Sequence, residues 1–341
     1  MINTSLFLKP DRIVDPTGWV GHIPFAFWVI ETLKPAVFVE LGTHTGNSYF
    51  SFCQSVNSNR LPTKCYAVDT WKGDEHAGFY DDTVFAEVAT YNENQYHSFS
   101  RLIRMTFDDA LSTFSDNSID LLHIDGLHSY EAVKHDFNAW LPKLSHRGVI
   151  LFHDINVRER DFGVWKLWEE LSALYPHLAF DHSSGLGVLI VGGNQNAGIL
   201  EIAKEFESLS GQHLIKSLFS RLGHMVDLEY HSKTFPRDIE VRDTEINSLN
   251  MMIDELENNI NTTFNFRFLR VPKPIKKLKN SIRKRLKKLQ EKFFSKSKYI
   301  PLSELKKKSP KIFLIGNKAN FLRLRCKLGL LLLIISHSFQ S

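Results

Sequence analysis

Cysteine is scarce in this chain: only Cys53, Cys65 and Cys326 occur in 341 residues. Their spacing matches no metal-binding motif, and three cysteines give no disulfide framework of the kind found in small secreted domains. Long apolar runs are also missing, since Leu328–Ile335 is apolar apart from Gly329 while a transmembrane helix needs about 20 residues. The N-terminus lacks the basic and apolar regions of a signal peptide. These absences predict a cytoplasmic protein.

Charge is distributed very unevenly along the chain. The overall formal charge is +4, but Arg267–Lys327 contains 22 Lys and Arg against two acids, a net charge of +20. The remaining 20 basic and 36 acidic residues give −16. An acidic body argues against nucleic-acid binding there, and the split predicts two functionally different parts.

Apolar runs and helical patterns alternate over about 190 residues, which predicts an α/β fold with a doubly wound, mostly parallel seven-stranded sheet. The last two strands adjoin through His182–Gly185 without a helix, so we expect an antiparallel edge pair. The expected strands are Ala36–Leu41, Lys64–Val68, Leu102–Met105, Ile119–Ile124, Gly148–Phe152, His177–Phe180 and Leu186–Val191. The expected helices are Trp19–Leu33, Ser48–Ser55, Asp109–Thr113, Tyr130–Leu141 and Asp161–Leu174.

The pattern becomes helical after residue 195, which predicts domains at 1–195, 196–265 and 266–341. Heptad positions in 239–260 favour a short self-associating coiled coil or, equally, a helix packed on the body. The 266–341 tail contains a basic amphipathic helix that begins after Pro272 and is suited to an anionic membrane surface; we assign the contact with that surface to 272–330. Nucleic-acid binding by the tail is less favoured, because it lacks interleaved aromatic residues for base stacking.

The first expected strand leads into the turn Glu40-Leu-Gly42-Thr43-His44-Thr-Gly46-Asn-Ser48. Glycines at such a turn let the backbone approach a ligand, and the following helix N-terminus favours an anion, although an ordinary tight turn would look the same. The second strand ends at Asp69, a position suited to ribose hydroxyls or simply to solvent. Asp108 and Asp109 follow the third strand and are suited to a helix cap and to a place near an adenine.

Two later strands end in an acid with a histidine close by. Ile119–Ile124 leads to Asp125, with His128 three residues further on, and Gly148–Phe152 leads to His153 and Asp154. Carboxylate and imidazole groups at the mouth of an α/β sheet suggest chemistry on a small molecule, with a divalent cation. The alternatives are that His128 only flanks the next helix N-terminus and that Asp154 stabilises its loop.

Four of these motifs resemble those of the class I S-adenosylmethionine-dependent methyltransferases, over about residues 20–192. They are Glu40–Ser48, Asp69, Ile119–Tyr130 and Gly148–Asp154. The E-x-G-x-x-x-G-x-S branch, with its cation-dependent O-methyltransferases of the catechol and macrolide-sugar types, is the most similar. The resemblance implies that the cofactor contacts Glu40, Gly42, Thr43, Gly46, Ser48, Asp69 and Asp108. It also implies that Asp125, His153 and Asp154 hold Mg²⁺ or Mn²⁺, with His153 replacing an acid, and that His128 is the catalytic base.

The chain is therefore expected to methylate a hydroxyl of a saccharide or similar polyol, free or lipid-linked. The segment Gly73–Tyr96, rich in aromatic and acidic residues, would supply a lid. The alternative is a catalytically degenerate methyltransferase fold that serves as a membrane-surface adaptor in glycan assembly. In either case we expect a cytoplasmic protein, held peripherally at the inner face of the membrane by its tail.

Overall fold

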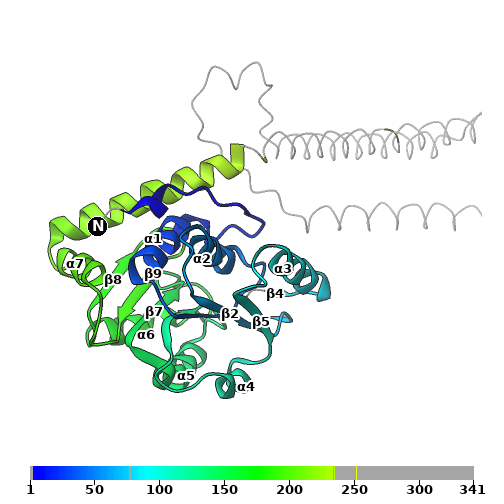
Figure 1. Cartoon of the computed structure of the whole chain (residues 1–341), viewed down its shortest axis with the longest axis horizontal. Coiled ribbons are helices and arrows are strands. Elements are labelled where there is room, and N and C mark those ends of the chain that lie inside the picture. The colour runs from blue at the N-terminus through cyan, green and yellow to red at the C-terminus, as the bar shows by residue number, and fades with distance from the viewer. Residues whose placement is uncertain (1–2, 77, 233, 235–250, 252–341) are drawn as a thin grey trace, which may run out of the picture. The chain divides into compact units, whose positions relative to one another are not determined.

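The computed structural model describes residues 3–76, 78–232, 234 and 251. Within them, seven strands form one sheet in the order β5-β2-β1-β6-β7-β9-β8 (Figure 1). The neighbours from β5 to β7 pair in parallel, whereas β9 is antiparallel to both β7 and β8. This confirms the predicted doubly wound sheet with an antiparallel edge pair. The strands are β1 (Val37–Leu41), β2 (Lys64–Asp69), β5 (Ser100–Arg104), β6 (Ile119–Ile124), β7 (Leu144–His153), β8 (His177–Phe180) and β9 (Leu186–Ile190).

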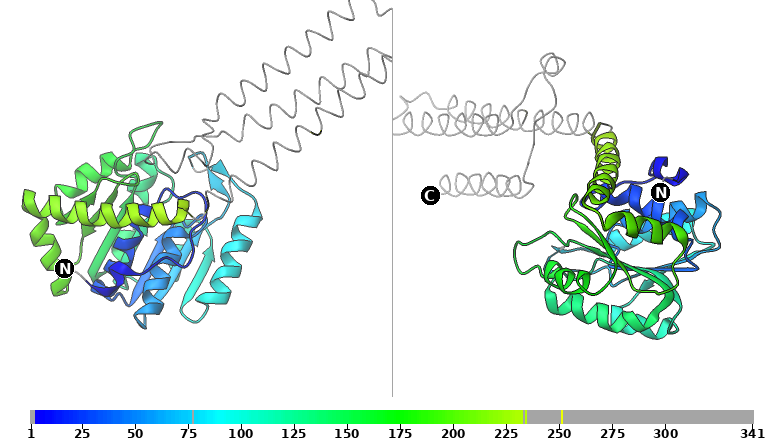
Figure 2. Two further views of the ribbon diagram at one scale, coloured as in Figure 1. Left: turned by 90° about the horizontal axis from the view of Figure 1, so that it is seen from above. Right: turned by 90° about the vertical axis from the view of Figure 1, so that its left-hand side faces the viewer.

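Helices cover both faces of the sheet, so the central strands are buried on two sides. One face carries α1 (Ile23–Leu33), α2 (Asn47–Ser58) and α3 (Asp82–Gln95), and the other carries α4 (Phe107–Ala110), α5 (Tyr130–Trp140) and α6 (Val164–Ser172) (Figures 1 and 2). Each face has its own apolar cluster of buried side chains. Because α1 lies between the sheet and further helices, nearly all of its residues are buried.

The chain after residue 195 contributes to this body. α7 (Ala197–Phe206) and the helical residues 209–232 bury Ile202, Phe206, Ile215 and Phe219 in the same apolar cluster as α1. The chain divides into two compact units, Met1–Asp243 and Thr244–Ser341. The predicted coiled coil of 239–260 (apart from Met251) and the tail of 266–341 lie outside the described residues. In the described part of the chain, every helix is too short or too polar to cross a membrane.

The predicted lid, Gly73–Tyr96, consists of two different elements. A small antiparallel hairpin, β3 (Gly73–Asp74) and β4 (Gly78–Phe79), precedes the helix α3. The sequence pattern missed α3 because only Val88 and Asn92 on it are buried, so it has almost no apolar stripe. Its start is nevertheless specified locally, since the Asp81 side chain accepts a hydrogen bond from the N–H of Thr83.

Candidate active site

The carboxyl ends of β1, β6 and β7 meet at one edge of the sheet. Leu41 pairs with Ile124, and Ile124 pairs with Phe152, so the turn after β1 lies beside the residues that follow β6 and β7. Gly42 has a φ of +87°, and a Cβ there would lie 2.1 Å from the backbone oxygen of Asp125. Glycine is therefore required at this position by contact with the chain itself, in addition to any approach of a ligand.

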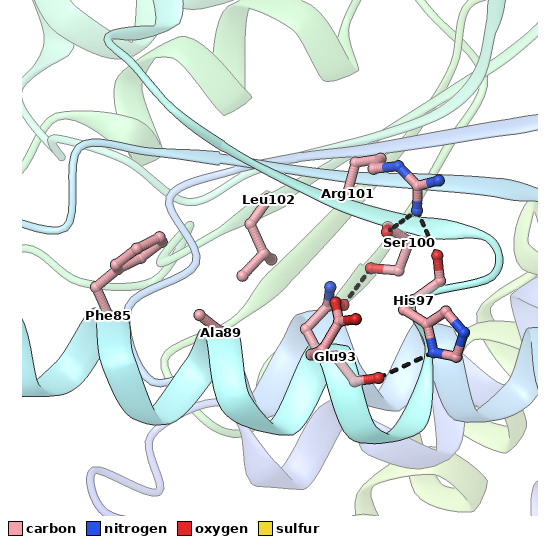
Figure 3. A pocket seen from close by; sticks show the side chains of 8 residues that line it. Phe85, Ala89, Glu93, His97, Ser100, Arg101 and Leu102 are labelled. Atoms are coloured by element: carbon pink, nitrogen blue, oxygen red, sulfur yellow. Dashed lines mark hydrogen bonds between the residues drawn. The ribbon is translucent and has the colours of Figure 1, made fainter.

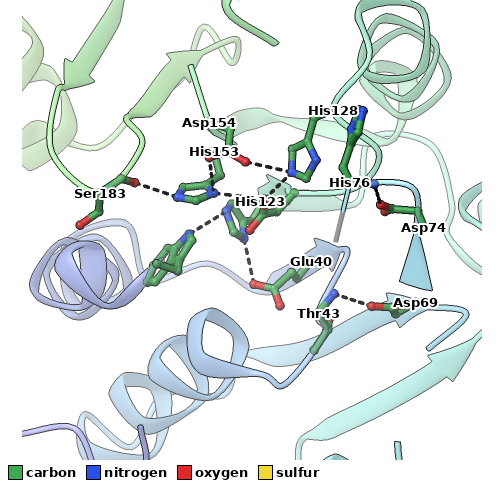
Figure 4. A network of polar contacts seen from close by, with 12 residues as sticks. Glu40, Thr43, Asp69, Asp74, His76, His123, His128, His153, Asp154 and Ser183 are labelled. Atoms are coloured by element: carbon green, nitrogen blue, oxygen red, sulfur yellow. Dashed lines mark hydrogen bonds and ion pairs between the residues drawn. The ribbon is translucent and has the colours of Figure 1, made fainter. Parts of the chain in front are cut away.

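Asp125, His128 and Asp154 converge at this edge, as Figure 4 shows for the two labelled members. One ligand atom from each lies within 4.8 Å of the others, and no other such group of three or more His, Cys, Asp or Glu occurs among the described residues. His128 Nε2 is 3.0 Å from Asp154 Oδ2 and 3.5 Å from Asp125 Oδ1. Asp154 adopts a left-handed backbone conformation, with a φ of +62°, which is strained for a residue other than glycine. This acid–imidazole group is defined below as the DHD centre.

The DHD centre holds its charges in a partly buried position. Burial alone would lower the pKa of His128, but hydrogen bonds to Asp125 and Asp154 raise it to about 10. Burial would likewise raise the pKa of Asp125, but the charge of His153 and the bonds from His128 and His153 hold it well below its usual value. At neutral pH an imidazolium therefore bridges two carboxylates.

His153 also contacts both carboxylates of the DHD centre, since its Nδ1 is 3.5 Å from Asp154 Oδ1 and lies close to Asp125 as well. Its Nε2 donates to the Ser183 carbonyl at 3.0 Å, and its Nδ1 is 3.2 Å from Asp125 Oδ1. We expected His153 among the metal ligands and His128 as the base. The structure brings both imidazoles within 3.5 Å of both carboxylates, and the two roles stay predictions. Ser129 caps α5 through the N–H of Ala132, so His128 also stands next to a helix N-terminus, as the alternative interpretation had it.

A buried chain of polar groups lies behind the centre and was missed by sequence reasoning. Trp19 Nε1 donates to His123 Nε2 at 3.3 Å, and His123 Nδ1 is 2.8 Å from Glu40 Oε2. Because an indole N–H can only donate, His123 Nε2 must be the acceptor, which leaves the proton on Nδ1 to be donated to Glu40 (Figure 4). Burial raises the pKa of Glu40, while His123 and Ser48 oppose that rise. A histidine between Leu122 and Ile124 in the buried strand β6 was the signal that could have revealed it.

The predicted cofactor residues on β1 and β2 are brought together. Asp69 is buried, and its Oδ2 accepts from the N–H groups of Thr43 and His44 at 2.8 and 2.9 Å, while its Oδ1 accepts from Trp71. Asp69 thus fixes the glycine turn to the end of β2. The Thr43 hydroxyl and Glu40 Oε1 are buried there without a partner among the described residues.

The N-terminal segment fixes the same turn from outside. The Asn47 side chain donates to the carbonyls of Val14 and Pro16 at 2.6 and 2.9 Å, and Arg12 donates to the Thr45 carbonyl at 2.7 Å. Gly46, with a φ of +83°, begins α2 directly after these contacts. The turn is therefore preorganised from both sides.

Asp108 lies apart from these residues, at the exposed start of α4. Its carboxylate is 2.8 Å from His135 Nε2. The predicted cap is wrong: α4 begins at Phe107, so Asp108 lies inside the helix, and Thr106 is the N-cap that accepts from the N–H of Asp109. The place of Asp108 near an adenine stays a prediction.

A pocket of about 490 Å³ opens beside the DHD centre. It is called the β7–α6 pocket here, because most of its wall is the loop between those elements. Its lining residues are His76, His128, Asp154, residues 156–160, Phe162 and Ser184. The Phe162 ring stacks on His128 and on His76, with 4.6 Å between ring centroids in both cases.

Comparisons with known proteins agree with this arrangement. Residues 39–155 match the family model of a methyltransferase domain. The chain is 45% identical over 227 residues to the uncharacterized protein y4gI of Sinorhizobium fredii, a match that covers 63% of this chain and 25% of that protein. The chain thus spans about a quarter of the length of this curated relative.

Similar solved structures include the O-methyltransferase TomG of Streptomyces achromogenes, in complex with S-adenosylmethionine (TM-score 0.39, 12% identity, 53% of this chain and 82% of that one). Another is the Podospora anserina methyltransferase PaMTH1, bound to S-adenosylhomocysteine (TM-score 0.38, 15% identity, 50% and 77%). The family match runs from within β1 to just past Asp154, and so includes the glycine turn, Asp69 and the DHD centre. The match identifies residues 39–155 as a methyltransferase domain, and the strand order and motifs described above are those expected of a class I S-adenosylmethionine-dependent methyltransferase.

Proposed function

We propose that this methyltransferase transfers the methyl group of S-adenosylmethionine to a hydroxyl of a saccharide or similar polyol, with the help of a divalent cation. The DHD centre carries the proposal, because two carboxylates and an imidazole converge within 4.8 Å next to the glycine turn. An acid–imidazole centre suits the deprotonation of a hydroxyl, which is a poor nucleophile at neutral pH.

The donor set fits a divalent cation. Asp125 and Asp154 offer the oxygen ligands that Mg²⁺ prefers. His128 lies beside them but would act as the base, because a nitrogen bound to the cation could not also accept a proton. His153, held by the Ser183 carbonyl, presents Nδ1 to Asp125 and would steady that ligand or join it. When bound, such a cation would lower the pKa of the acceptor hydroxyl.

The residues of the chain have separate tasks in this reaction. Glu40, Gly42, Thr43, Gly46, Ser48 and Asp69 would orient the cofactor, so that its methyl carbon faces the acceptor oxygen in line with the breaking C–S bond. The new C–O bond forms as that bond breaks, and the sulfonium becomes a neutral thioether. His128 would take the hydroxyl proton, which it can do only as a neutral imidazole, after the proton that bridges the two carboxylates has left.

Calorimetric titration with S-adenosylmethionine, with and without Mn²⁺, tests the proposal. We expect binding by the wild type, loss of binding in Asp69→Ala, and methyl transfer to a sugar acceptor that a chelator suppresses. Asp116→Ala is a matched control, because this exposed acid precedes β6 and so lies at the opposite edge of the sheet from the glycine turn. Full methyl transfer by both Asp125→Ala and His128→Ala would refute the assigned roles.

The basic tail supports a second proposal, attachment to an anionic membrane surface where lipid-linked glycans are assembled. Its net charge of +20 is the observation that favours it, whether the methyltransferase body is active or has become an adaptor. Flotation with vesicles containing anionic lipid would show loss of binding when the chain is truncated after Pro272. Unchanged flotation would exclude tethering by the tail. Light scattering of a 239–260 deletion would test self-association.

A further inference from the structure

We propose that the β7–α6 pocket binds an anionic group, a phosphate or a carboxylate, carried by the acceptor. This inference rests on the proposed function, because the pocket is identified as the acceptor site by its position beside the DHD centre. It extends the expected substrate from a neutral polyol to a sugar that bears a negative charge.

Position is the first argument. His128 and Asp154 belong both to the DHD centre and to the wall of the pocket. The strand order places the cofactor turn on β1, the centre at the ends of β6 and β7, and the pocket on the loop after β7. A molecule in the pocket can therefore present a hydroxyl to the centre, while the rest of it contacts the loop.

The second argument is a pair of preoriented arginines on the loop. The guanidinium of Arg158 lies 4.2 Å from the Trp165 ring centroid, and that of Arg160 lies 4.9 Å from the Phe162 centroid. Stacking on a ring fixes the plane of a guanidinium and leaves its N–H groups at the edge free to bind a carboxylate or phosphate. Arg160 uses one nitrogen for a long bond of 3.4 Å to the His76 carbonyl.

The existing pairs of these arginines are weak enough to leave room for a ligand. Arg158 is paired with Glu169 at 3.3 Å, but both side chains are more than half exposed, so water screens the pair. Glu159 is the one further acid that lines the pocket besides Asp154. An anion that reached Arg158 and Arg160 would therefore meet two cations. The acids near them, Glu159, Asp161 and Glu169, are all exposed, so water screens their charges.

A buried atom in the wall gives the third argument. The His76 side chain is only 4% exposed, its Nε2 is 2.6 Å from Asp161 Oδ1, and its Nδ1 has no partner among the described residues. A buried polar atom without a partner is unfavourable, and a hydroxyl of a bound sugar would satisfy it. The stacked rings of His76 and Phe162 add an aromatic wall of the kind that sugar rings contact.

Three sugars with the same gluco-configured ring test the proposal by calorimetry, without cofactor or cation: glucose, glucuronate and glucose 1-phosphate. We expect one or both anionic sugars to bind at least about tenfold more tightly than glucose, since a charge-assisted hydrogen bond contributes about 1.5 kcal/mol or more. Preference for the phosphate or for the carboxylate would identify the group. Equal binding of all three, or no binding of either anion at 20 mM, would overturn the proposal.

Charge variants on the surface provide the controls. Arg158→Gln combined with Arg160→Gln should weaken the anionic sugars about tenfold and leave glucose unchanged, whereas Glu159→Gln should strengthen them. Arg101→Gln is the matched control: this exposed arginine lines a separate pocket of about 420 Å³ between α3 and β5 (Figure 3). An equal loss in Arg101→Gln would refute the assignment to the β7–α6 pocket. Because the assay needs no methyl transfer, its result is independent of the test of the proposed function.

Discussion

Replacing His123 by leucine tests the buried chain that links Trp19, His123 and Glu40. The variant removes the donor to Glu40 Oε2 at 2.8 Å and the acceptor of the Trp19 N–H at 3.3 Å, both in a region without solvent exposure. Leucine fills much of the volume of the imidazole, so the loss is mainly electrostatic. We expect a large decrease in the free energy of unfolding.

The magnitude follows from the two groups left behind. A buried carboxylate that loses its partner destabilises a protein by about 3–5 kcal/mol. A buried N–H without an acceptor adds about 1–3 kcal/mol. The sum, about 4–8 kcal/mol, is comparable to the whole stability of an ordinary domain, about 5–15 kcal/mol. His123→Leu should therefore be marginally folded at room temperature.

Glu40→Gln supplies the matched control. A glutamine keeps an oxygen that can accept from His123 Nδ1 and carries no charge, so alone it should change stability by less than about 1.5 kcal/mol. In the double variant no charge remains buried, and we expect about half of the loss to be recovered. Urea unfolding at pH 7.5 measures all four proteins of this cycle. If His123→Leu costs less than about 1 kcal/mol, or if Glu40→Gln gives no rescue, Glu40 is not a buried carboxylate that depends on the N–H of His123.

Three further predictions concern other positions. Burial raises the pKa of Asp136 to about 7. The stability that this group contributes is fully present below its unfolded pKa of about 4 and is lost as the pH rises towards 7. In urea unfolding, Asp136→Asn should therefore be about 2–3 kcal/mol more stabilising at pH 8 than at pH 5. Gly42→Ala should lower stability by about 2–4 kcal/mol, because its Cβ would collide with the Asp125 backbone. Gly78→Ala, with a φ of +86° but open space around it, should cost about 1 kcal/mol, and equal losses would contradict the collision. Binding of Mn²⁺ at pH 7.5 should release about one proton from His128, seen as a dependence of the calorimetric enthalpy on the buffer; no release would show that the cation binds elsewhere.

Much of the fold could be predicted from local patterns. β6 and β8 have the predicted bounds, and the antiparallel edge pair follows from the short His182–Gly185 connection. These features depend on apolar runs and turn residues close together in sequence. α3 was missed because a surface helix with two buried residues leaves almost no apolar pattern.

The sequence by itself determined that an acid and an imidazole follow each of two buried strands, and that a glycine turn and an acid precede them. Parallel strands bring their carboxyl ends to one edge, so the meeting of Asp125 with Asp154 was predictable from order alone. Only the tertiary structure decided how the histidines join them. His153 is adjacent to Asp154 in sequence and His128 is three residues after Asp125, yet each imidazole lies within 3.5 Å of both carboxylates. The Ser183 carbonyl, from the loop between β8 and β9, accepts from Nε2 of His153, so only its Nδ1 faces the acids. The position of His153 depends on its contact with Ser183, and the Trp19–His123 pair likewise joins residues far apart in sequence. No local sequence pattern encodes either contact.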